Sequence, residues 1–125
     1  MERACYTYFY VAFGEDFDLK DFCAQLGLSY EKTLKCVHKN SLKLGRNDEF
    51  NIDINEMVRV TLKDLFGKEE ILLSLKEKYA LEYYLERVPT LEADSERPNQ
   101  CLSLDFDIIE FLYKTRTRDD LDYYV

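Results

Sequence analysis

Residues 5–13, CYTYFYVAF, alternate between two kinds of side chain. One set contains Cys5, Thr7, Phe9, Val11 and Phe13, and the other contains Tyr6, Tyr8, Tyr10 and Ala12. Because successive side chains of a strand point to opposite faces, this alternation predicts a β-strand with two chemically different faces. The chain is therefore expected to build a sheet around this strand.

Helical spacing replaces the alternation after Gly14. Residues 18–27, DLKDFCAQLG, end in Gly27, where a C-terminal cap glycine belongs, and predict a helix. Its apolar positions are Leu19, Phe22, Cys23 and Leu26. The same spacing over residues 55–79, interrupted at Gly67, predicts two helices or one broken helix, and a further helix is expected near residues 107–114.

Three more segments have the pattern of strands. These are residues 49–54, residues 80–88 with Pro89 after them, and residues 121–125, LDYYV. Residues 90–100 read as an exposed loop. Residues 30–46 leave two interpretations open, because their lysines recur at helical spacing while their Ser, Asn and β-branched residues favour an irregular strand and loop.

These segments, in a chain of 125 residues with 46% hydrophobic residues, indicate one domain over residues 1–125. The expected fold class is α+β, with a mainly antiparallel or mixed β-sheet and about four helices packed on it.

Two helix starts share one design. Residues 17–22, FDLKDF, and 106–111, FDIIEF, each place an aspartate before an apolar helix and flank it with phenylalanines. We interpret Asp18 and Asp107 as helix caps with a hydrophobic staple. The alternative is a catalytic pairing of carboxylates, in which Asp16 and Asp18 would work with Asp105 and Asp107.

The ends of the chain resemble a known family. The first strand followed by FDLKDFCAQLGL, then LSLDFDIIEFL and the final LDYYV, over residues 5–28 and 101–125, resembles the bacterial family known as domain of unknown function 4279. Members of that family often have a tryptophan in the central strand region, whereas this chain has none. The resemblance implies an α+β fold and implies no activity.

The net charge of −8 disfavours nucleic acid as a partner. The first residues lack the pattern of a signal peptide, and no apolar run reaches the roughly 20 residues that span a bilayer, so we expect a cytoplasmic protein without a membrane partner. The four cysteines, Cys5, Cys23, Cys36 and Cys101, have no paired spacing and are expected to be free thiols.

Motifs for chemistry are missing from the chain. Its only histidine, His38, is expected to be solvated or partly packed, and a metal site built on His38 and Cys36 would lack the paired ligands at short spacing that such sites use. The sequence has neither a GxxxxGK[ST] nor a GxGxxG loop. We therefore expect no cofactor, no metal and no catalytic residue.

Two surface features remain. Residues 32–46 hold five basic residues and no acid, which is either a solvated face or a docking strip for an acidic partner or anionic ligand. Tyrosines beside acids are the second feature, and they form the candidate binding set. This set is Glu82, Tyr83, Tyr84, Glu86, Asp120, Asp122, Tyr123 and Tyr124.

The sequence thus favours a non-catalytic protein-binding module, of which an immunity or inhibitor-type protein that binds a basic partner is one form. A small-ligand-binding or accessory domain is the first alternative. An enzyme that uses the aspartate clusters is the second.

Overall fold

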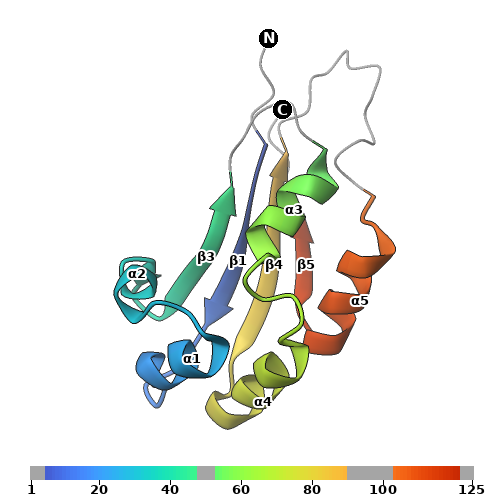
Figure 1. Cartoon of the computed structure of the whole chain (residues 1–125). Coiled ribbons are helices and arrows are strands. Elements are labelled where there is room, and N and C mark those ends of the chain that lie inside the picture. The colour runs from blue at the N-terminus through green and yellow to red at the C-terminus, as the bar shows by residue number, and fades with distance from the viewer. Residues whose placement is uncertain (1–4, 48–52, 90–102, 122–125) are drawn as a thin grey trace.

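The computed structural model describes residues 5–47, 53–89 and 103–121. These residues form a five-stranded sheet with helices layered against one of its faces (Figure 1). The strands are β1 (Cys5–Ala12), β2 (Val37–His38), β3 (Ser41–Asn47), β4 (Glu82–Pro89) and β5 (Arg118–Leu121). The helices are α1 (Leu19–Leu26), α2 (Tyr30–Leu34), α3 (Ile54–Leu62), α4 (Glu69–Tyr79) and α5 (Phe106–Thr115).

The strand order in the sheet is β2-β3-β1-β4-β5. β1 lies in the middle and pairs antiparallel with β3 and β4, whereas β5 joins β4 in parallel after the crossover through α5. The first four strands and the helices between them follow the β-α-β-β-α-β order of a split βαβ unit, to which α5 and β5 add one edge. The predicted α+β class with a mixed sheet is confirmed.

The two faces of β1 are as different as its alternation predicts. Thr7, Phe9 and Val11 are fully buried against the helices, where the Thr7 hydroxyl lies 2.6 Å from the Thr61 hydroxyl of α3. Tyr6, Tyr8 and Tyr10 point to the other face and are half-buried. No helix among the described residues covers that second face (Figure 1).

The ambiguous residues 30–46 contain both of the structures that their sequence left open. Ser29 caps the short helix α2 through its hydroxyl, which accepts a hydrogen bond from the backbone N–H of Lys32. The chain then turns into the hairpin of β2 and β3. The predicted strand over residues 49–54 lies mostly outside the described residues, and its last residue, Ile54, begins α3 instead.

The two shared helix starts differ in the structure. Asp18 caps α1 by accepting a hydrogen bond from the Asp21 N–H at 3.2 Å, and Phe17 packs on Phe22 as the staple predicts. The prediction for Asp107 is wrong, because α5 begins one residue earlier and Asp105 occupies its N-cap position. The carboxylates of Asp105 and Asp107 bind Arg59 of α3 instead, at 2.5 and 3.0 Å.

Asp21 ties α1 to α4. Its carboxylate accepts hydrogen bonds from Lys78 Nζ at 2.8 Å, from the Tyr79 hydroxyl at 2.6 Å and from Gln25 Nε2 at 3.1 Å. These donors, Lys78 first, hold the pKa of Asp21 at about 2, well below its ordinary value. The ionised carboxylate therefore contributes to the folded state.

We expect this contribution to disappear in acid. A carboxyl whose pKa is lowered by folding stabilises the protein above its unfolded pKa near 3.8, and this stability is lost as the pH falls towards about 2. The difference in unfolding free energy between the wild type and Asp21→Asn should therefore shrink between pH 4 and pH 2 in denaturant titrations. A difference that stays constant over that interval would contradict the assignment.

Candidate functional site

Helix α5 is apolar on two sides. Its inner residues, Ile108, Phe111 and Leu112, are buried in the core, where the Phe111 ring packs on Phe9 and Phe66. Its outer side carries Phe106, Ile109 and Tyr113, with 76%, 50% and 75% of their surfaces exposed. We call these three residues the α5 stripe. Their spacing of three and four residues places them along one side of the helix.

The stripe is unusual for this molecule. The described residues include five large hydrophobic side chains that are exposed, and three of them belong to the stripe. The other two, Leu34 and Val60, lie on α2 and α3. Single exposed hydrophobics are ordinary, whereas three on one side of a helix make that side a candidate docking surface.

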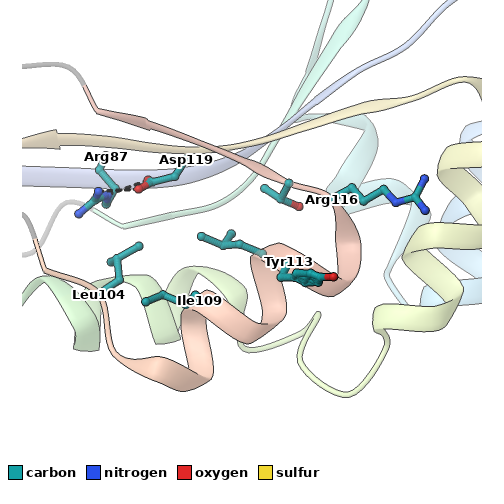
Figure 2. A pocket seen from close by; sticks show the side chains of 8 residues that line it. Arg87, Leu104, Ile109, Tyr113, Arg116 and Asp119 are labelled. Carbon is teal, nitrogen blue, oxygen red and sulfur yellow. Dashed lines mark hydrogen bonds and ion pairs between the residues drawn. The ribbon is translucent and has the colours of Figure 1, made fainter.

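A pocket of about 620 Å³ opens beside the stripe (Figure 2). Ile109, Leu112 and Tyr113 of α5 line one side, together with Leu104 from the segment before the helix. The edge of the sheet lines the opposite side through β4 and β5. The pocket thus joins the exposed apolar stripe to the polar edge of the sheet.

An ion pair lies on the sheet side of this pocket. Arg87 of β4 donates to both carboxylate oxygens of Asp119 on β5, from Nε at 2.8 Å and from Nη2 at 2.6 Å. The Arg87 side chain is 4% exposed, so its charge depends on partners such as this one. Arg116 also lines the pocket, but its side chain extends away from the pair (Figure 2). The lining thus combines apolar residues with one ion pair and one further cation, Arg116.

The fold does not bring the candidate binding set together on one surface, because some of its members are buried. Tyr83 is a correction, because it is fully buried and its hydroxyl donates to the Leu72 carbonyl at 2.7 Å. Burial raises the pKa of Tyr83 above its ordinary value. Glu86 is also buried and leaves the set. Asp122, Tyr123 and Tyr124 lie outside the described residues.

The remaining members lie on the open face of the sheet. Tyr84 is half-buried and Glu82 and Asp120 are exposed there. The sequence missed that this face also holds cations over its tyrosines. Lys43 Nζ lies 4.7 Å from the Tyr8 ring centre, and the guanidinium carbons of Arg46 and Arg118 lie 4.5 and 6.0 Å from those of Tyr6 and Tyr84. The face is therefore aromatic with both signs of charge, rather than aromatic with an acidic rim.

The aspartate clusters do not meet in one place. Asp18 lies at the start of α1 and Asp105 and Asp107 at the start of α5, on opposite sides of the helical layer (Figure 1). Arg59 lowers the pKa of Asp107, and the carboxylates in turn raise the pKa of Arg59. A lowered pKa suits an ion pair and is opposite to the raised pKa of a general acid.

The histidine and two of the cysteines are surface or core residues. His38 is exposed on β2, and Cys36 is exposed nearby. Cys23 is a buried free thiol, and burial raises its pKa. Within residues 5–47, 53–89 and 103–121, no three His, Cys, Asp or Glu side chains gather into a metal-binding group.

None of the helices in the described part of the chain has the length and apolarity needed to cross a membrane.

No family model, curated protein or solved structure matches the chain. The resemblance of its ends to domain of unknown function 4279 stays a prediction.

Proposed function

We propose that this chain is a non-catalytic protein-binding module whose partner covers the α5 stripe and inserts an apolar side chain into the neighbouring pocket. The observation that carries the proposal is the exposure of Phe106, Ile109 and Tyr113 on one side of one helix. Interface centres are apolar and aromatic, and their energy concentrates in a few residues beside a pocket.

The charged groups around the stripe are paired with one another. Glu110 and Lys114 on α5 form an ion pair at 3.3 Å, and Asp105 and Asp107 bind Arg59. Glu56 also pairs with Arg59 at 2.8 Å, so these six paired groups together keep a net charge of −2. We expect the partner to contribute aliphatic or aromatic side chains on a helix or loop. An inhibitor or immunity-type role is one form of this function, because it needs binding and no chemistry in the chain itself.

Replacing two members of the stripe should weaken binding at least 30-fold without unfolding the protein. Ile109→Gln/Tyr113→Gln removes two exposed side chains, so the unfolding free energy should change by about 0.5 kcal/mol or less per site. Loss of partner contacts at a hot spot weakens binding by at least 2 kcal/mol, or about 30-fold. Leu34→Gln is the matched control, because Leu34 is an exposed hydrophobic residue on another helix.

The measurement is photo-crosslinking in cells from a benzoylphenylalanine placed at position 106 or 113. We expect a discrete adduct from these positions and none from position 34, and Ile109→Gln should remove the adduct. An adduct of twice the chain mass would identify the partner as a second copy of this chain, which sedimentation would then confirm. Equal crosslinking from positions 34 and 113 would overturn the proposal.

A further inference from the structure

A second hollow lies at the opposite side of the helical layer, and it shares no lining residue with the α5 pocket. Its volume is about 370 Å³, and we call it the basic pocket. Its apolar lining comes from the turn after α1, from β3 and from α3 with the turn after it. These residues are Leu28, Leu44, Val60 and Leu65. A volume at the low end of ligand sites fits a small molecule.

Lysines from two segments line the same pocket. Lys32 comes from α2 and Lys63 from the end of α3, and Asp64 is the one carboxylate in the lining. Arg46 of β3 borders the pocket, but its guanidinium lies over Tyr6 on the open face of the sheet. Among the residues that the structure describes, Lys32 and Lys63 make no salt bridge. The pocket is therefore locally positive in a chain whose net charge is −8.

The fold sorts the basic stretch of residues 32–46 into separate roles. Lys32 lines the pocket, and the charged groups of Lys43 and Arg46 lie over Tyr8 and Tyr6 on the open face of the sheet. Lys35 and Lys39 are exposed outside the pocket lining. Lys63 joins the pocket from outside the stretch. Charge density along the sequence thus did not identify this group, which depends on how α2, β3 and α3 meet.

Gly45 shapes the base of the pocket. It lines the hollow with φ +64°, and α3 approaches β3 so closely there that an added Cβ would lie 2.1 Å from the Thr61 carbonyl oxygen. The exposed thiol of Cys36 lines another side and donates to the Lys32 carbonyl at 3.5 Å. A bound molecule would therefore shield Cys36 from solvent.

We propose that the basic pocket binds a small organic anion, a carboxylate with a short aliphatic body. The carboxylate would pair with Lys32 and Lys63, and the aliphatic body would cover Leu44 and Val60. Charge complementarity and apolar burial then act on the two ends of one ligand. This site is independent of the α5 stripe.

Octanoate is the probe, and its binding is read at Cys36. Alkylation by neutral iodoacetamide, followed peptide by peptide with mass spectrometry, should slow at least fivefold when octanoate saturates the pocket. Buried Cys23 serves as the internal reference. Isothermal titration calorimetry gives the dissociation constant on the same full-length chain.

The variants test the charges directly. Lys32→Gln/Lys63→Gln should weaken octanoate binding at least 10-fold, while Lys35→Gln/Lys39→Gln removes the same charge outside the lining and should change it less than twofold. Octylammonium, with the same tail and the opposite charge, should not protect Cys36. Equal losses in both double variants, protection by octylammonium, or no protection by millimolar octanoate would each overturn the proposal.

Discussion

Gly45→Ala is expected to destabilise the protein by about 3 kcal/mol or more. Gly45 has φ +64°, a region that costs an alanine about 1–2 kcal/mol. The new Cβ would also lie 2.1 Å from the Thr61 carbonyl oxygen, and because that atom belongs to the backbone of α3, the helix itself must shift. Overpacking of this kind adds about 1–3 kcal/mol. Denaturant unfolding monitored by circular dichroism measures the change.

Gly67→Ala is the matched control for this experiment. Gly67 also has a positive φ, +84°, but a Cβ there would meet nothing within 4 Å. The Gly67→Ala substitution should therefore cost only the energy of holding an alanine at positive φ, about 1–2 kcal/mol. The difference between the two losses of unfolding free energy measures the cost of the close contact between β3 and α3. If both variants lose the same stability, the contact at Gly45 is not what limits substitution.

The fold was predictable where the buried residues of an element recur with the regular spacing of a strand or a helix. The alternation in residues 5–13 predicted β1 and both of its faces. The spacing over residues 55–79 predicted two helices or one broken helix, and the structure has two, α3 and α4. The residues at 30–46 resisted prediction, because α2 is only five residues long and β2 two. Elements this short hold too few repeats to show a period, and tertiary contacts decide their structure.

The candidate sites were less predictable than the fold. The sequence predicted a helix near residues 107–114, yet that helix is apolar on two sides, so its period could not separate buried Ile108 from exposed Ile109. Arg87 and Asp119 are 32 residues apart and meet only because β5 lies beside β4. The basic pocket likewise needs three elements that are separated in the sequence. Such groups form only when distant elements pack together, so no short stretch of the sequence predicts them.

Tyr83→Ala should cost about 3–5 kcal/mol, whereas Tyr84→Ala should cost about 1 kcal/mol or less. The two tyrosines are neighbours on β4, but they point to opposite faces of the sheet. Tyr83 is fully buried, and its ring packs on Phe9 with 5.3 Å between ring centres. Tyr84 is half-buried on the open face and meets Tyr10 and Arg118. Comparing the two variants therefore shows how much more stability a tyrosine contributes in the core than on the open face.

Tyr83→Phe separates the hydroxyl from the ring. The Tyr83 hydroxyl donates to the Leu72 carbonyl of α4 at 2.7 Å, so its removal should cost about 1 kcal/mol while the ring keeps its packing. The order of stability should therefore be wild type, then Tyr83→Phe and Tyr84→Ala close together, then Tyr83→Ala. Urea midpoints of the four proteins test it. If Tyr84→Ala were as unstable as Tyr83→Ala, the open face would be packed as tightly as the core, and a partner could not reach the tyrosines there.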